Sequence, residues 1–131
     1  MSRGDARMKI VPGTVLLPGG VEEPRSSTED EKWVRCAACG ARLAPEQARI
    51  DIDGSHEHER MNPSGLRFVL ACFAVAPGCE PNGPPSPVWT WFPGHEWQIA
   101  LCRGCGAHVG WSFHAAERAP FYGLVRDRTV S

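Results

Sequence analysis

Two short stretches of the sequence, CAACG and CRGCG, contain the residue types best suited to binding a metal ion. Each holds two cysteines at Cys-x-x-Cys spacing, which forms a tight turn that directs both thiolates at one point. The glycine after each pair permits a positive φ, so main-chain N–H groups can turn toward the sulfurs. The four thiols belong to Cys36, Cys39, Cys102 and Cys105. They predict a closed tetrahedral site for a structural Zn²⁺ ion, with no open position for catalysis.

The two remaining cysteines lack this spacing. Cys72 lies in an apolar run and is predicted to be a small buried side chain. Cys79, in the stretch APGCEPNG, is predicted to be an exposed loop thiol. No histidine stands beside either cysteine in the sequence, so we expect neither to be a catalytic nucleophile.

The composition favours one small domain without a charge-driven partner. The 131 residues include 14 Lys and Arg against 15 Asp and Glu, and no basic block or acidic tail suggests binding to nucleic acid. The start of the chain has no signal-peptide pattern, and no stretch has the ~20 apolar residues that span a bilayer. We expect a cytoplasmic monomer that does not bind membranes. Because the cytoplasm is reducing, its cysteines are predicted to be metal ligands and free thiols.

The elements that must position these residues are predicted to be short strands. Residues 1–32 are rich in Pro, Gly and polar side chains and are predicted to form a flexible N-terminal arm. The folded part is expected to begin near Trp33. Strands are predicted at Arg49–Asp53, Arg67–Val75, Val88–Phe92, Trp97–Leu101, His108–Phe113 and Tyr122–Arg126. The run Arg67–Val75 is almost continuously apolar, which predicts a central strand. Turn signals such as PNGPP separate the strands, and Pro45–Ala48 is predicted to form a helical turn.

Four of the five tryptophans lie close to the second cysteine pair, in VWTWFPGHEWQIALCRGCGAHVGWSF. Strand alternation predicts that Trp89 and Trp91 share one face of their strand. It also predicts that Val109, Trp111 and Phe113 share one face of a later strand. The Phe-Pro-Gly turn brings Trp97 back toward Trp91. The aromatic side chains could form an ordinary core. Their position around a turn beside a metal-anchored loop also fits a binding cage.

The run WFPGHEWQIALCRGCGAHVGWSF resembles the cereblon-type thalidomide-binding domain, known as the CULT domain, with the pattern W-F-x-G, W, C-x-x-C and H-x-G-W-x-[FY]. Upstream, HEHERMNPSG resembles the family's Asn-Pro stretch, and FYGLVRDR resembles its closing strand. The resemblance covers residues 33–128 and is to single-domain bacterial relatives. It implies a mainly β fold of the β-tent type, in which two antiparallel sheets are pinned by a zinc site of four cysteines.

The resemblance also implies a function without catalysis. Trp91, Trp97 and Trp111 would form three walls of a cage, with Phe113 as its floor and Asn62 and Pro63 beside its mouth. The guest would be a cyclic imide, such as the glutarimide ring of thalidomide-type compounds or an imide at a damaged protein C-terminus. The main chain around Trp89–Trp91 would bond its polar edge. Trp89 stands where animal cereblon has histidine.

Two other functions fit parts of the pattern. A zinc-bearing methionine sulfoxide reductase also uses two Cys-x-x-Cys pairs, but it needs a reactive cysteine on its last strands, and HVGWSFHAAERAPFYGLVRDR has none. An aromatic cage could instead read a methylated cation, which would want a carboxylate nearby. Glu96 is expected to point away from Trp97, which favours a neutral guest. His56, His58 and His95 are predicted to be polar loop residues, and His108 to be structural.

Overall fold

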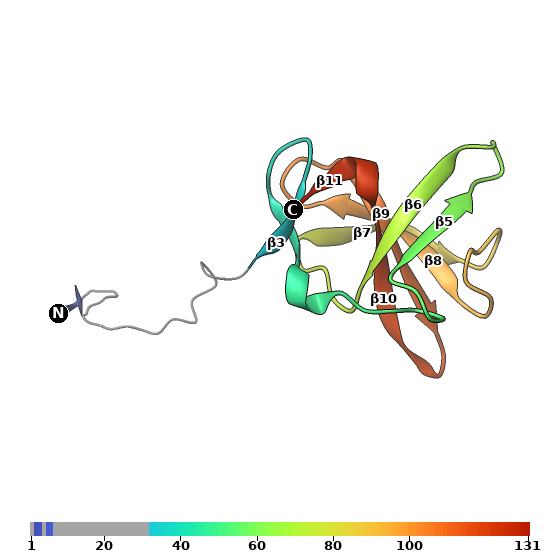
Figure 1. Cartoon of the computed structure of the whole chain (residues 1–131), viewed down its shortest axis with the longest axis horizontal. Coiled ribbons are helices and arrows are strands. Elements are labelled where there is room, and N and C mark those ends of the chain that lie inside the picture. The colour runs from blue at the N-terminus through green and yellow to red at the C-terminus, as the bar shows by residue number, and fades with distance from the viewer. Residues whose placement is uncertain (1, 4, 7–31) are drawn as a thin grey trace. The chain divides into compact units, whose positions relative to one another are not determined.

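The computed structural model describes residues 2–3, 5–6 and 32–131 (Figure 1). The chain divides into two units, residues 1–32 and residues 33–131. In the first unit, β1 (Ser2–Arg3) pairs in parallel with β2 (Asp5–Ala6). The rest of the predicted flexible arm, apart from Lys32, lies outside the described residues.

The second unit is built on a six-stranded sheet in which every neighbouring pair is antiparallel. In spatial order its strands are β5 (Glu57–Met61), β6 (Arg67–Phe73), β10 (Arg118–Val125), β9 (His108–Ala115), β8 (Glu96–Cys102) and β7 (Cys79–Ser86). A second antiparallel sheet has the order β11 (Thr129–Val130), β3 (Trp33–Cys36) and β4 (Arg42–Pro45). The predicted mainly β fold with two antiparallel sheets is confirmed.

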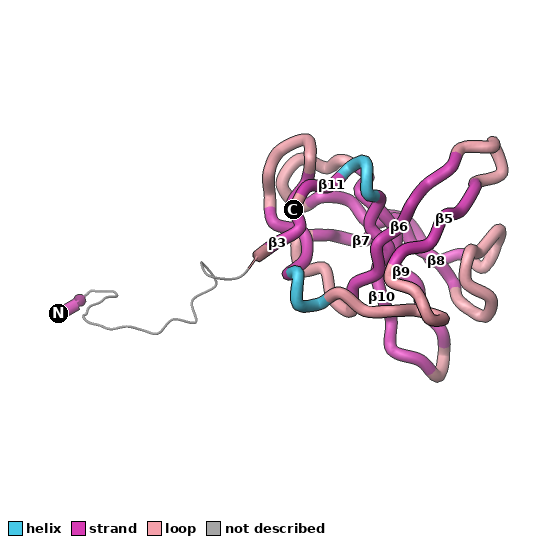
Figure 2. Tube along the Cα trace, in the orientation of Figure 1, coloured by secondary structure: helices cyan, strands magenta, loops and turns pink. Residues whose placement is uncertain are grey.

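The small sheet lies at one side of this unit, and the β5–β6 hairpin tip and the loop before β8 lie at the other (Figure 1). Two short 3₁₀ helices, η1 (Glu46–Ala48) and η2 (Arg126–Arg128), accompany the small sheet (Figure 2). The predicted helical turn at Pro45–Ala48 therefore matches η1.

The interior strand β6 explains why its sequence is apolar without alternation. Leu70 and Cys72 belong to one buried cluster, whereas Ala71 and Phe73 belong to another. Successive side chains of a strand point to opposite faces, so both faces of β6 are covered. The prediction of a strand inside the sheet is confirmed, although β6 ends at Phe73.

Three local predictions about strands and turns were wrong. Residues Arg49–Asp53 form only isolated bridges, and Asp53 has a φ of 52°. Residues Val88–Phe92 form turns and bends, and Trp89 has a φ of 56°. A positive φ interrupts an extended strand. In contrast, the stretch PNGPP is part of β7, an edge strand, where a proline without an N–H group is tolerated.

The predicted grouping on the strand that became β9 was also wrong in part. The pairing of β8 with β9 shifts between Ala100 and Leu101, which marks a bulge. Val109 consequently packs in the buried cluster that contains Val34 and Leu43 of the small sheet. Phe113 belongs to the other buried cluster, and Trp111 packs against that one. The His108 ring contacts the Trp111 ring at 4.7 Å between centroids, although two residues three apart on a regular strand would lie on opposite faces.

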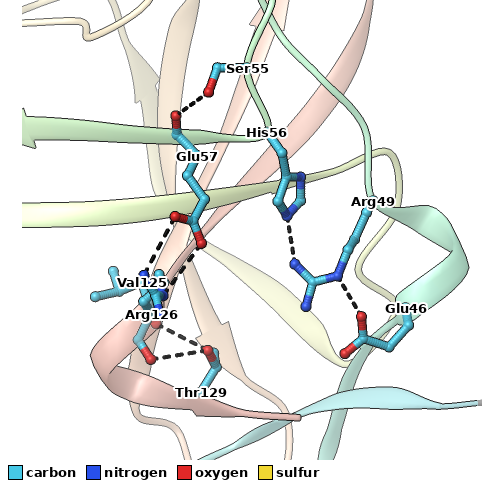
Figure 3. Close-up of polar contacts among 8 residues, drawn as sticks. All are labelled: Glu46, Arg49, Ser55, His56, Glu57, Val125, Arg126 and Thr129. Atoms are coloured by element: carbon cyan, nitrogen blue, oxygen red, sulfur yellow. Dashed lines mark hydrogen bonds and ion pairs between the residues drawn. The ribbon is translucent and has the colours of Figure 1, made fainter.

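Polar contacts fasten the edge strand β5 and the segment before it to the rest of the domain (Figure 3). Arg126, in η2, forms an ion pair with Glu57 at 3.4 Å. Arg49 contacts both Glu46 of η1 and the His56 ring. The first contact joins β5 to the C-terminal segment, and the contacts of Arg49 join the residue before β5 to η1.

Candidate functional site

The four predicted metal ligands lie together. Their sulfur atoms are all within 4.8 Å of one another, with 3.8 Å between the sulfurs of Cys36 and Cys105 and 3.6 Å between those of Cys39 and Cys102. Cys36 ends β3 and Cys102 ends β8, so the cluster joins the small sheet to the large one. The four cysteines could therefore hold one metal ion.

Two matching turns position the four thiols. In the first, the N–H of Gly40 donates to the Cys36 carbonyl at 2.8 Å, and Gly40 has a φ of 80°. In the second, the N–H of Gly106 donates to the Cys102 carbonyl at 2.8 Å, and its φ is 79°. Both glycines adopt the left-handed conformation that their place in the motif predicted. The N–H of Gly104 also donates to the Cys102 sulfur at 3.3 Å.

The sulfur geometry agrees with a tetrahedral zinc site. With Zn–S bonds of about 2.3 Å, the sulfurs of a regular tetrahedron lie about 3.8 Å apart. Two of the six sulfur separations, 3.6 and 3.8 Å, are close to that value, and all six are within 4.8 Å. Four thiolates also match the soft ligands that zinc prefers in closed sites. The residues thus fit a structural zinc ion.

The other two cysteines are both buried. Cys72 is a core residue, as predicted. Cys79 was predicted to be exposed and is 4% exposed, because it begins β7 and lies opposite Cys102 in the sheet. Burial raises the pKa of each thiol to about 12. Neither has the low pKa that a nucleophilic cysteine needs.

A cavity of about 300 Å³ lies among the aromatic residues. It is lined by Asn62, Pro63, Val88, Trp89, Trp91, Trp97, Trp111 and Phe113. All seven residues predicted to bind ligand are therefore brought to one cavity. Val88 was missed, and its only sequence signal is its place beside Trp89. The cavity volume is at the lower end of the range for small-molecule pockets, about 300–1,000 Å³.

The indole N–H groups of two wall tryptophans are bonded to main-chain carbonyls. Trp91 Nε1 donates to the Met61 carbonyl at 3.0 Å, and Trp97 Nε1 donates to the Val88 carbonyl at 2.6 Å. The rings of Trp91 and Trp111 meet edge to face, with centroids 4.8 Å apart and planes at 76°. Because the polar N–H atoms of Trp91 and Trp97 are used by the protein, these two indoles can offer carbon surface to a guest.

The walls are supported from behind. Phe68 contacts the rings of both Trp91 and Trp111, at 5.8 and 5.3 Å between centroids. Arg60 donates from Nε to the Trp91 carbonyl at 3.3 Å and lies over the Phe92 ring. Sequence reasoning missed Arg60, because its partner is about thirty residues away and no local pattern signals the contact.

The histidines near the cavity are structural groups. His95 was predicted to be a solvated turn residue, but it is 4% exposed and packs against Phe92 and Phe121. His108 Nε2 bonds to the Gly110 carbonyl at 2.9 Å, and burial lowers the pKa of its imidazole. The neutral ring then packs against Trp111.

His56 and His58 bond to main-chain carbonyls of the segment before β5, Ile50 and Ile52 respectively, both at 2.9 Å. They shape the base of the β5–β6 hairpin.

Residues 33–131 thus form a two-sheet β domain with a cluster of four cysteines that could hold a metal ion and an aromatic cavity formed partly by the β5–β6 hairpin tip. No protein-family model matches the chain. The chain is similar to the protein cereblon of Drosophila erecta, 50% identical over 101 residues that cover 71% of this chain. It is also similar to the protein cereblon of Danio rerio, 48% identical over 71 residues, and of Gallus gallus, 40% identical over 73 residues, each covering 51% of this chain.

These similarities show that the chain carries a cereblon-type domain. The chain matches only 16% of the length of each of these relatives. Among the described residues, no helix is long and apolar enough to span a membrane.

Proposed function

We propose that residues 33–128 form a binding module that holds the ring of a cyclic imide in the aromatic cavity, without catalysing a reaction. The observation that carries the proposal is the convergence of Trp91, Trp97 and Trp111 on one cavity, with Phe113 beside them. These side chains come from the loop before β8 and from β8 and β9 themselves, so the cavity is a product of the fold.

The chemistry of an imide ring fits this cavity. The ring has two apolar faces, which indole and phenyl carbon atoms can desolvate, and a polar edge that needs hydrogen bonds. Within residues 32–131, the main-chain N–H groups of Trp89 and Trp91 donate no hydrogen bond to the protein. They are therefore available to the carbonyl oxygens of the edge.

The proposed metal is zinc, and its role is structural. Four thiolates fill the coordination shell, so the ion offers no site to a substrate. Cys102 ends β8, the strand that carries Trp97 near its start, and Cys105 lies just before β9, which carries Trp111. Holding these two cysteines therefore fixes the strands that supply two cavity walls.

A methylated cation is the competing guest. Cation cages combine aromatic faces with a carboxylate. None of the described residues that line the cavity is Asp or Glu. Glu96 stands in the sequence directly before Trp97, but its side chain is exposed. A neutral ring suits these walls better.

The reductase alternative is also disfavoured, because both cysteines outside the four-cysteine cluster are buried and have raised pKa values.

Titration of tryptophan fluorescence tests the proposal. Glutarimide should quench the signal, with an affinity in the micromolar range or weaker, because eight heavy atoms at about 1 kcal/mol each support roughly −8 kcal/mol. N-methylglutarimide should not bind, because it lacks the edge donor and adds bulk. Tetramethylammonium should not bind either. Equal binding of glutarimide and its N-methyl derivative would refute the proposal.

Substitutions locate the binding to the cavity. Trp97→Ala or Trp111→Ala should weaken glutarimide binding by about 2 kcal/mol, roughly 30-fold, because each removes a wall. Trp33→Phe is the matched control, since Trp33 is in β3 and does not line the cavity. Its affinity should equal that of the wild type.

A further inference from the structure

Trp89 combines two unfavourable features beside the cavity. Its side chain is 71% exposed, although tryptophan carries a large apolar ring. Its φ is 56°, in the left-handed region that non-glycine residues rarely adopt. Strained residues of this kind concentrate at ligand clamps, where the surrounding structure holds them.

The segment around Trp89 is held in place by hydrogen bonds. The N–H of Val88 donates to Ser86 Oγ at 3.1 Å, and the Val88 carbonyl accepts the Trp97 indole N–H at 2.6 Å. On the far side, Thr90 Oγ1 donates to the Phe92 carbonyl at 3.2 Å. The exposure of the Trp89 ring is therefore built into an anchored segment.

A second exposed apolar side chain lines the same cavity. Val88 is 58% exposed, and Val88 and Trp89, which both line the cavity, are called here the apolar rim. Asn62 and Pro63, at the tip of the β5–β6 hairpin, line the cavity as well, and the N–H of Leu66 donates to Asn62 Oδ1 at 2.8 Å.

We propose that the apolar rim binds the side chain of an apolar residue directly preceding the ring in a polypeptide that ends in a cyclic imide, and that Trp89 determines this specificity. The inference rests on the proposed function. A ring held among the cavity walls must direct its attached chain through the mouth, where the rim lies. An apolar side chain there would cover surface that is otherwise in contact with water.

The charged residues do not favour an ionic group in the guest. None of the described residues that line the cavity carries a charge. Arg60, which contacts the wall residue Trp91, uses its Nε to donate to the Trp91 carbonyl at 3.3 Å. Selection by the rim would therefore depend on apolar contact and on the face of the Trp89 ring.

The test compares four probes by fluorescence titration or calorimetry with the full chain. They are glutarimide, 3-phenylglutarimide, and 3-aminoglutarimide acylated by acetyl-Phe or by acetyl-Gly. The acetyl-Phe probe should bind wild type about tenfold more tightly than the acetyl-Gly probe, as expected for one added aromatic contact. Trp89→Asn should reduce that ratio to within about twofold, and asparagine is chosen because it tolerates a positive φ.

Two readouts separate specificity from damage to the loop. In Trp89→Asn the affinities for glutarimide and for the acetyl-Gly probe should change by the same factor, and Trp89→Phe should keep most of the preference for acetyl-Phe. An unchanged ratio in Trp89→Asn, or equal binding of the two peptide probes by wild type, would overturn the inference while leaving imide binding intact. If 3-phenylglutarimide bound more tightly than glutarimide but the acetyl-Phe probe bound no more tightly than the acetyl-Gly probe, the inference would also be overturned, in favour of a free small molecule as the guest. Failure of all four probes to bind wild type would overturn the proposed function itself.

Discussion

Replacing Cys105 by serine is expected to lower stability far more than replacing the deeply buried Cys72 by alanine. Cys105 is exposed and packs little, whereas Cys72 lies in the core. If burial alone set the cost, the Cys72 substitution would be the worse of the two. If a bound metal ion sets it, the order is reversed. The comparison therefore isolates the metal site from ordinary packing.

The sequence separation within the cysteine cluster sets the expected loss of stability in Cys105→Ser. Cys36 and Cys105 are 69 residues apart, with their sulfurs 3.8 Å apart. Closing a loop of this length by one cross-link lowers the entropy of the unfolded chain, which stabilises the folded state by about 4 kcal/mol. That is a large part of the ~5–15 kcal/mol that stabilises a typical domain. At ~4–8 °C per kcal/mol, Cys105→Ser should lower the melting temperature by roughly 15–30 °C. Cys72→Ala should cost about 1 kcal/mol.

Circular dichroism measures the melting temperature of each protein. Elemental analysis after dialysis against a chelator measures its zinc content. Wild type and Cys72→Ala should retain about one zinc per chain, and Cys105→Ser should lose it. A Cys105→Ser protein that keeps both its metal and its melting temperature would show that the cluster is not a metal site.

Three further predictions concern the rest of the chain. In the zinc-loaded native protein, iodoacetamide at pH 8 should leave Cys72 and Cys79 unmodified, because burial raises both pKa values to about 12; mass spectrometry before and after unfolding checks this. Gly110→Ala should destabilise by about 1–3 kcal/mol or more in urea unfolding, since its new Cβ would lie 2.2 Å from the Gly123 carbonyl oxygen; wild-type stability would contradict that packing. Finally, a chain beginning at Glu31 should melt within a few degrees of full length, because the composition of residues 1–32 predicts no apolar face to bury, and a large drop in calorimetry would refute this.

Much of the candidate site could be predicted from the sequence because its signals are local. The spacing of Cys36 with Cys39 and of Cys102 with Cys105, each pair followed by glycine, is a property of single turns, and the four sulfurs do come together. The apolar run of β6 likewise identified an interior strand, because a strand covered on both faces needs no polar positions. The density of tryptophans near the second pair indicated the cavity, because large aromatic side chains from neighbouring strands meet.

Other features were decided by contacts between distant segments. Cys79 looked like a loop thiol, but pairing with β8 places it opposite Cys102 in the core. His95 looked solvated, but the turn that carries it folds onto Phe92 and Phe121. Alternation predicted a strand around Trp89. Instead, the Trp97 indole N–H donates to the Val88 carbonyl and the Val88 N–H donates to Ser86 Oγ, and these bonds hold a bent segment. A periodic pattern reports only which face a side chain would take in a regular strand. Tertiary contacts decided whether the strand formed and what its side chains then touched.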